Sequence, residues 1–283
     1  MKTIRKIKKI LQSKPTLEGA GVKLKRVFGY YETPLLDPFL LLDNFGSEKP
    51  DDYIAGFPWH PHRGIETVTY MLSGEVEHGD SIGNKGIIYS GDVQWMTAGS
   101  GIIHQEMPKR FDGRMRGFQL WVNLPASHKM MDPRYRDVRK ETIPEFSPNP
   151  DVKIKIIAGE MNGTKGPVQD LVVDTEYFDI TLSPDTEFEK QVKSDYKVFA
   201  FVFEGSGYFD PDEKELIRGD HLVVFDNGDK VKISTKDKSV RFLFITGQPL
   251  NEPIAWRGPI VMNTDEELAV AFQEYRNGTF IKK

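Results

Sequence analysis

Short runs of apolar and β-branched residues recur along most of the chain, separated by glycine, proline, asparagine and aspartate. Long helical periodicity is nearly absent until the end of the sequence. Many short strands at such spacing favour a sandwich or barrel of β-sheets over alternating strand–helix units. The pattern predicts strands at residues 66–72, 86–89, 93–96, 117–123, 152–157, 178–182, 198–203, 221–225, 230–234 and 240–246.

A helical pattern with a clear start signal covers residues 264–276, near the C-terminus. Asn263 or Thr264 can cap its first turn, in which acidic residues cluster. Apolar residues then recur at helical spacing and would form a buried stripe. The stripe consists of Leu268, Ala271, Phe272 and Tyr275. A shorter helix is expected at residues 127–131.

The chain also repeats a sequence pattern. The segment 70–75 (YMLSGE) is similar to 201–206 (FVFEGS), and each is followed at a similar distance by a Gly-Asp step, at Gly91 and at Gly219. Such a repeat is expected of two copies of one β domain with slightly different hairpins.

A linker between the two copies is predicted at residues 140–150, a polar stretch that contains prolines. We therefore predict an all-β protein of two tandem barrels. The first domain would span residues 1–142 and the second residues 143–283, ending in the helix.

Composition excludes several classes of protein. Lysine and arginine number 38 against 42 acidic residues, so the chain lacks the basic field of general nucleic-acid binding. The absence of cysteine excludes disulfides, thiolate nucleophiles and iron–sulfur ligation. No apolar stretch is long enough for a membrane helix, and no apolar core follows the basic N-terminus as in a secretory signal. We expect a cytoplasmic protein, or a nuclear one in a eukaryote.

Two histidine-containing segments of the first copy indicate a metal site. His60 and His62 are two residues apart, as are His104 and Glu106. In a strand, such residues project to the same face. If both segments line one barrel interior, three imidazoles and a carboxylate converge, a set that suits Fe(II) and also Mn, Co, Ni, Cu or Zn. A single His-x-His pair is more often a surface feature, but two such pairs in one β domain favour a metal.

Glu66 is a second candidate carboxylate, because an unbroken strand would place it on the face of His62. Its alternative role is to orient a histidine ring or Arg63. The remaining histidines (His78, His128 and His221) are expected in turns, at the surface or in packed positions.

The second copy serves as an internal control. Counting from the matched glycines aligns the candidate ligands with residues that do not form a metal site, which predicts a single site in the first domain. His60, His62, Glu66, His104 and Glu106 align with Gln191, Lys193, Lys197, Lys232 and Ser234, respectively.

Several segments resemble the pirin family of the cupin superfamily, in order along nearly the whole chain. They are DPFLLLDNFG (37–46), FPWHPHRGIETVTYMLSGEVEHGDS (57–81), GDVQWMTAGSGIIHQEMP (91–108), FQLWVNLP (118–125) and GPIVMNTDEELAVA (258–271). The resemblance implies two jelly-roll-like barrels, with one metal, usually iron and here Fe(II), in the N-terminal barrel only. It also implies that the C-terminal helix packs back toward the first barrel. The implied ligands are His60, His62, His104 and Glu106, which leaves Glu66 outside the ligand set.

The resemblance implies two different activities. One is quercetin 2,3-dioxygenase chemistry, in which O2 opens the heterocyclic ring of a flavonol and carbon monoxide is released. The other is a non-enzymatic role as an iron-dependent, redox-sensing cofactor that binds transcription regulators. Both need the same ligands, so the ligand set does not separate them.

Under the dioxygenase hypothesis, the partners are O2 and a small aromatic substrate, and the protein is expected to be a monomer. Glu106 would take the proton of the flavonol hydroxyl, with Glu66 as the alternative base. The predicted substrate contacts are Phe57, Trp95, Gln119 and Trp121. For the aromatic residues, a place in the protein core is an equally open interpretation.

Overall fold

The computed structural model describes residues 3–282 and divides the chain into two units. Barrel N consists of Lys14–Lys140 and the chain from Leu250 onward, and barrel C of the chain up to Ser13 and Glu141–Pro249. The division near residue 140 is close to the one expected from the sequence. The termini differ from that expectation, because each terminal segment belongs to the barrel with which it pairs or packs.

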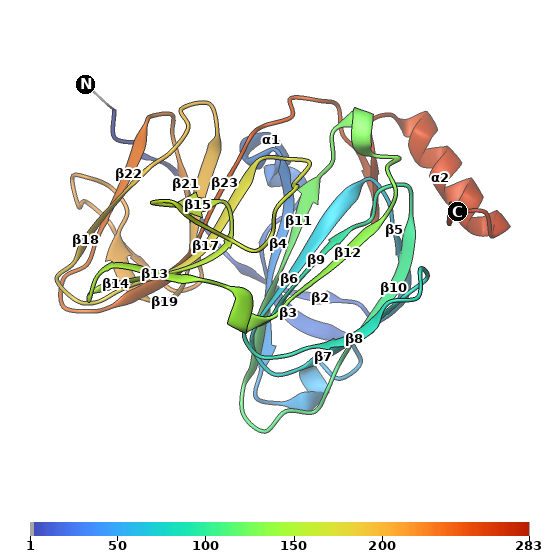
Figure 1. Cartoon of the computed structure of the whole chain (residues 1–283), viewed down its shortest axis with the longest axis horizontal. Coiled ribbons are helices and arrows are strands. Elements are labelled where there is room, and N and C mark those ends of the chain that lie inside the picture. Colours follow the sequence, from blue (N-terminus) through green and yellow to red (C-terminus); the bar gives the residue numbers. More distant parts are fainter. Residues whose placement is uncertain (1–2, 283) are drawn as a thin grey trace. The chain divides into compact units, whose positions relative to one another are not determined.

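Barrel N contains two antiparallel sheets, which Figure 1 shows on opposite sides of the barrel. One has seven strands: β12 (Arg134–Val138), β9 (Val93–Thr97), β6 (Ile65–Ser73), β11 (Met115–Asn123), β4 (Phe39–Ser47), β3 (Val22–Phe28) and β2 (Lys14–Glu18). The other has four: β5 (Phe57–His62), β10 (Ile102–Pro108), β7 (Val76–Asp80) and β8 (Lys85–Ile88). Along β10 every second residue is buried, the alternation expected of a strand with one face toward the barrel interior.

Short helices and a C-terminal segment complete barrel N. The short helices are η1 (Tyr30–Glu32), α1 (Thr33–Leu36), η2 (Pro50–Asp52) and η3 (Ala126–His128). The C-terminal segment contains β24 (Ala255–Arg257), β25 (Ile260–Met262) and α2 (Asp265–Asn277). The helix expected at 127–131 is the single turn η3. Within residues 3–282, no helix combines the length and the apolar character needed to cross a membrane.

Barrel C repeats the same plan. Its main sheet contains β1 (Ile7–Gln12), β21 (His221–Phe225), β19 (Lys197–Tyr208), β23 (Val240–Gly247), β17 (Thr175–Leu182), β14 (Val152–Ala158) and β13 (Glu145–Asn149). The remaining elements are β18 (Glu187–Gln191), β22 (Lys230–Ser234), β20 (Leu216–Arg218), the pair β15 (Glu160–Met161) and β16 (Thr164–Lys165), and η4 (Lys140–Thr142) at the boundary. Its core is rich in phenylalanine, valine and isoleucine, most of them from these strands.

The duplication inferred from the sequence is confirmed by the strand order. The path β12-β9-β6-β11-β4-β3-β2 of barrel N corresponds strand for strand to β1-β21-β19-β23-β17-β14-β13 of barrel C. Each of the ten strands predicted from the hydrophobic pattern overlaps an observed strand. The two barrels are therefore two copies of one β domain, and the fold is that of two tandem barrels with a C-terminal helix.

The register predicted for the second copy needs one correction. The pair β5–β10 corresponds to β18–β22, and His60 lies opposite His104. Along β10, His104 and Glu106 lie on the buried face, but along β22 the buried face carries Val231 and Ile233, and Lys232 lies on the other face. Lys232 is therefore not the counterpart of His104. The predicted register is wrong, because a shift of one residue is enough to exchange the two faces of a strand.

The C-terminal helix α2 forms as predicted and belongs to barrel N. Thr264 is its cap: its hydroxyl accepts a hydrogen bond from the Glu267 amide at 3.2 Å, and the Glu267 carboxylate accepts one from the Thr264 amide at 3.1 Å. Gly278 ends the helix in the left-handed conformation. The buried side of α2 packs in a cluster with the end of the chain and with β24 and β25. Of the predicted stripe, Leu268 and Ala271 are buried, Phe272 is half-buried and Tyr275 is exposed.

Candidate metal centre and its cavity

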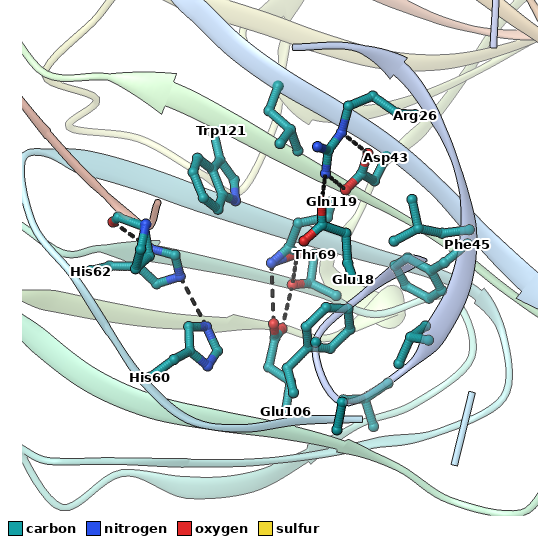
Figure 2. A pocket seen from close by; sticks show the side chains of 18 of the residues that line it. Glu18, Arg26, Asp43, Phe45, His60, His62, Thr69, Glu106, Gln119 and Trp121 are labelled. Atoms are coloured by element: carbon teal, nitrogen blue, oxygen red, sulfur yellow. Dashed lines mark hydrogen bonds and ion pairs between the residues drawn. The ribbon is translucent and has the colours of Figure 1, made fainter. Parts of the chain in front are cut away.

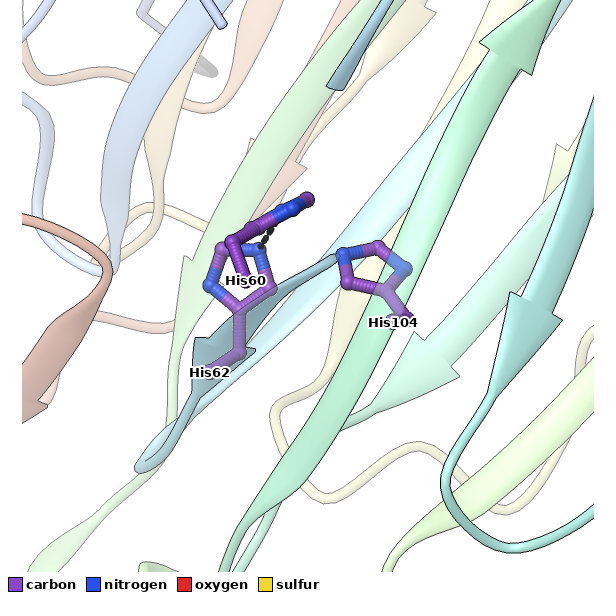
Figure 3. A group of neighbouring side chains, drawn as sticks. All are labelled: His60, His62 and His104. Atoms are coloured by element: carbon purple, nitrogen blue, oxygen red, sulfur yellow. Dashed lines mark hydrogen bonds between the residues drawn. The ribbon is translucent and has the colours of Figure 1, made fainter. Parts of the chain in front are cut away.

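Three histidines from two neighbouring strands converge inside barrel N (Figure 3). His60 and His62 point the same way from β5, and β10 places His104 directly opposite His60. One ring nitrogen from each histidine lies within 4.8 Å of the others. The convergence predicted from the two-residue spacing is therefore present for the histidines.

Backbone carbonyls fix the orientation of two of these rings. Nδ1 of His60 lies 2.9 Å from the carbonyl oxygen of Pro58, and Nδ1 of His62 lies 3.0 Å from that of Pro259. Because a carbonyl oxygen can only accept, each Nδ1 must carry the hydrogen, which leaves the Nε2 lone pair available. The two Nε2 atoms face each other at 3.1 Å. Two lone pairs at that distance repel unless a cation or a proton lies between them.

His104 shows the same need for a partner. It is fully buried, and among residues 3–282 neither of its ring nitrogens has a hydrogen-bond partner. A buried polar atom without a partner is costly, so such groups usually indicate a missing ligand or water. Three nitrogen donors arranged in this way fit a first-row divalent metal ion.

Burial also keeps two of the imidazoles neutral. Loss of hydration lowers the pKa of His62 and that of His104 well below the ordinary value of 6.5, and the neighbouring histidines lower both further. Because a metal binds the neutral imidazole, these two ligands need not lose a proton at neutral pH before binding.

Glu106 lies on the same strand face as His104 and lines the same cavity as His60 and His62. In the structure, its carboxylate accepts hydrogen bonds from Thr69 Oγ1 at 2.9 Å and Gln119 Nε2 at 3.1 Å. It is not part of the group of closely spaced ligand atoms, which consists of the three histidines. Its role as a fourth ligand remains a prediction.

The contacts around Glu106 outnumber the hydrogens available to them. The Thr69 hydroxyl lies near both Glu106 Oε1 and Gln119 Oε1, the latter at 2.6 Å. A hydroxyl has one hydrogen, so the three contacts among Thr69, Gln119 and Glu106 share only two hydrogens. A proton on Glu106 would donate to the Thr69 oxygen and complete the triangle.

Glu66 is not part of this site. The chain turns at Gly64, where φ is +77° and a side chain would collide with the Val261 carbonyl, so β5 and β6 are separate strands. The argument that Glu66 shares a face with His62 is therefore wrong. Its buried carboxylate accepts hydrogen bonds from Trp95 Nε1 at 3.0 Å and Thr97 Oγ1 at 2.5 Å, and it does not line the cavity.

A cavity of about 650 Å³ opens beside the histidines (Figure 2). Three of the four predicted substrate contacts line it: Phe57, Gln119 and Trp121. The fourth, Trp95, is fully buried in the core and bound to Glu66, so the prediction that it contacts substrate is not supported. The sequence did not indicate the other wall residues, which include Glu18, Arg26, Tyr30, Asp43, Thr69 and Trp256.

His78 takes one of the positions expected for it, a packed one, but in a strand rather than in or near a turn. It lies buried in β7, directly opposite Glu106. Its ring centroid is 5.4 Å from that of His104, and its Nε2 lies 3.2 Å from Asp80 Oδ2. His78 and Asp80 are two residues apart, a spacing that places both side chains on the same face of a strand. This spacing could have indicated that His78 lies in a strand next to His104.

The corresponding strands of barrel C, β18 and β22, carry different residues on their two faces. Phe188, Val231 and Ile233 lie on the buried face. On the other face, Lys232 pairs with Glu187 and Lys230 with Glu189, each at 2.9 Å. A metal site confined to barrel N remains the prediction for the whole chain.

Comparison with known proteins identifies the family. A family model described as Pirin matches residues 21–122, and one described as Pirin C-terminal cupin domain matches residues 177–281. The chain belongs to the pirin family. This confirms the resemblance drawn from its sequence motifs and identifies the two barrels as cupin domains.

Individual relatives cover nearly the whole length of this pirin-family chain. A pirin-like protein of Caulobacter vibrioides is 44% identical over 98% of this chain and 99% of its own length. A solved structure of quercetin 2,3-dioxygenase from Acinetobacter baumannii has a TM-score of 0.91 at 33% identity, covering 98% of this chain and 99% of that one. The Escherichia coli pirin YhhW, solved in complex with nickel(II), has a TM-score of 0.66 at 20% identity over 85% of this chain and 98% of that one, a likeness of fold alone.

The C-terminal segment of barrel N braces the strand end that carries His62. Arg63 is buried, and its guanidinium pairs with Glu274 at 2.7 Å, donates to the Phe280 carbonyl at 2.8 Å and lies over the Phe280 ring. Arg63 also forms a β-bridge with Ile260. Residues far away in sequence therefore hold the metal-site strand in place.

A buried lysine ties the same region together. Lys129 Nζ donates to the carbonyls of Gly64 and Val261 and to Asn123 Oδ1, at 3.0, 3.2 and 2.7 Å. No carboxylate is among these partners, and burial lowers the pKa of Lys129 to about 7. Above about pH 7, the folded protein would therefore release a proton that the unfolded chain keeps up to about pH 10.4, and one of the three acceptors would lose its hydrogen.

This shift predicts a pH-dependent stability. Between about pH 7 and about pH 10 the unfolded state binds more protons at Lys129 than the folded state, so stability must rise with pH. Relative to Lys129→Met, the wild type should gain about 3 kcal/mol between about pH 7 and about pH 9.5. Urea denaturation of both proteins across this range measures the difference. Parallel stability profiles would show that Lys129 stays charged in the folded protein.

Proposed function

We propose that this pirin-family chain is a metal-dependent dioxygenase that opens the ring of flavonols such as quercetin with O2. The observation that carries the proposal is a buried three-histidine cluster next to a cavity of about 650 Å³ with aromatic walls. A cavity of this size and character suits a flat aromatic molecule. The quercetin 2,3-dioxygenase of Acinetobacter baumannii, which shares 33% of its residues with this chain, supports the same reaction class.

The proposed cofactor is one divalent first-row metal ion per chain. His60, His62 and His104 would hold it, with Glu106 as the carboxylate ligand. Fe(II) is our first choice, and Mn, Co, Ni, Cu or Zn would also suit these donors. When bound, the ion would supply the Lewis acidity and the redox chemistry that a reaction with O2 requires.

The protein's own contribution is to position the substrate and accept its proton. Phe57 and Trp121 line the cavity and would pack against the aromatic rings. Glu106 lies 2.9 Å from Thr69 Oγ1, an oxygen that can accept a hydrogen bond from an added proton while its own hydrogen turns to Gln119 Oε1. It would take the proton of the flavonol hydroxyl, and that proton would then donate to Thr69 Oγ1.

Replacing Glu106 by glutamine tests this role. Glu106→Gln keeps the shape of the side chain but cannot accept the proton, so turnover should fall about a hundredfold while flavonol binding changes little. Steady-state rates and binding titrations on protein with equal metal content measure the two effects. Glu77→Gln, which alters an exposed carboxylate on the adjacent strand β7, is the matched control and should retain full turnover. Unchanged turnover in Glu106→Gln would exclude Glu106 as the base.

The proposed activity itself is tested by reconstitution. Metal is added to the apoprotein without oxygen, quercetin and then air are introduced, and flavonol absorbance and carbon monoxide are followed. Turnover that depends on metal and is lost in His62→Ala is the expected result. Tight metal binding without turnover on a panel of flavonols would contradict the proposal and favour the non-enzymatic role, an iron-binding, redox-sensing cofactor of transcription regulators.

A further inference from the structure

A row of four polar residues crosses the cavity face of the larger sheet in barrel N. Arg26 on β3 lies directly opposite Asp43 on β4, Asp43 opposite Gln119 on β11, and Gln119 opposite Thr69 on β6. Directly paired residues project to the same face, and all four side chains line the cavity. Three strand spacings separate the ends of the row, a span of about 14 Å.

The two ends of this row are chemically different. Thr69 and Gln119 contact Glu106, which lies on the metal-site strand. At the other end, Arg26 forms a two-bond ion pair with Asp43 at 2.8 and 2.9 Å and also pairs with Glu18 at 2.9 Å. Figure 2 shows this second group on the side of the cavity away from His60 and His62.

We propose that Glu18, Arg26 and Asp43 form a distal subsite that recognises hydroxyl groups at the end of the substrate remote from the metal. The proposal rests on the function proposed above and specifies its substrate class. That class is a planar aromatic molecule with hydrogen-bond donors at the distal end and no negative charge there.

The charge of the group explains the preference for donors. One guanidinium faces two carboxylates, so the subsite carries excess negative charge and repels an anionic end group. Each carboxylate oxygen that binds Arg26 can accept a further hydrogen bond, and a phenolic hydroxyl supplies it.

Burial explains why the subsite should discriminate strongly. The Asp43 side chain is only 7% exposed, so a ligand that fills the cavity removes most of its remaining access to water. A ligand without a distal hydroxyl would leave these carboxylates with fewer hydrogen bonds, and sites built to bind a hydroxyl reject analogues that lack one.

The middle of the cavity fits the same class of ligand. Trp121 and Trp256 line it with ring centroids 5.9 Å apart, and Trp121 packs edge-on against His62. These aromatic faces can cover a flat ring system along its length. A flavonol with its reacting ring near the histidines would then present its outer ring to the distal subsite.

Binding without turnover tests the subsite. Zinc-loaded protein, freed of excess metal and kept without oxygen, is titrated with quercetin and with galangin, which lacks the two hydroxyls of the outer ring. Quenching of tryptophan fluorescence measures each affinity. In the wild type, quercetin should bind about tenfold more tightly than galangin. In Glu18→Gln and in Asp43→Asn this ratio should fall toward one, with the affinity for galangin unchanged.

The controls separate recognition from stability. Asp43→Asn removes a buried ion-pair partner and can impair folding, whereas Glu18 is 39% exposed and its variant should fold normally. Asp52→Asn breaks a similar ion pair, with Lys23, outside the cavity and should keep the wild-type ratio.

Three results would overturn the subsite: equal affinities in the wild type, equal weakening of both ligands in the variants, or no binding of either flavonol. Failure of the proposed function gives a different result. If the protein binds quercetin selectively but never turns it over, the subsite is supported and the dioxygenase function is rejected. Turnover without selectivity rejects the subsite alone.

Discussion

Replacing His60 and His104 together by alanine should reduce the metal content of the purified protein to background. The two substitutions remove one ligand from each strand of the cluster and leave His62 as the only one of the three histidines. A single imidazole, with or without Glu106, cannot hold a divalent ion against the competition of water and buffer. Elemental analysis after growth in iron-supplemented medium measures the effect, and circular dichroism checks that the β fold is retained.

The matched control removes two histidines outside the cluster. His128 lies in the turn η3 and His221 in barrel C, where its Nδ1 contacts the carbonyls of Arg218 and Gly219. The double variant His128→Ala/His221→Ala should bind as much metal as the wild type. Metal that survives the loss of His60 and His104, or that disappears in the control, would show that the site lies elsewhere.

The histidine cluster was predictable because its geometry is local. His60 and His62 need only the two-residue period of one strand, and the same holds for His104 and Glu106. The remaining assumption, that the two strands are neighbours, is met by the pairing of β5 with β10. The motifs shared with the pirin family led to the same residues.

Glu66 shows where local reasoning fails. Its predicted direction depended on a strand continuing from His62, but the positive φ at Gly64 starts a new strand with a different pairing. A single glycine, at which a side chain would collide with the Val261 carbonyl far along the chain, changed the face on which Glu66 lies.

The walls of the cavity could not be predicted for a related reason. Trp256 reaches the cavity from the C-terminal segment, and Arg26 meets Asp43 only through the pairing of β3 with β4. Neither residue has a sequence pattern that indicates a binding site, and strand register over such separations is a property of the tertiary structure. The repeat register failed similarly, because a shift of one residue along β22 exchanges the face that points into the barrel.

Removing the C-terminal segment should have the largest effect on stability. A chain ending at Pro259 lacks β25 and α2, and with them the buried side chains Ile260, Val261, Met262, Leu268 and Phe280. At about 2 kcal/mol for each buried side chain, the loss is on the order of 10 kcal/mol, comparable to the whole stability of a typical domain. Arg63 would also lose its ion pair with Glu274. Barrel N should therefore lose its cooperative unfolding transition, as calorimetry would show.

Two point variants on α2 distinguish packing from a general effect of altering the helix. Leu268 is 4% exposed and packs in the cluster with Ile260 and Met262, whereas Val270, two residues away, is 55% exposed. Leu268→Ala should lower the free energy of unfolding by about 3 kcal/mol, and Val270→Ala by less than about 0.5 kcal/mol.

Because the same segment supplies the Pro259 carbonyl that orients His62, Leu268→Ala should also release bound metal faster to a chelator. Equal effects of the two variants, or a truncated chain with unchanged melting, would show that α2 does not support the metal-site strand.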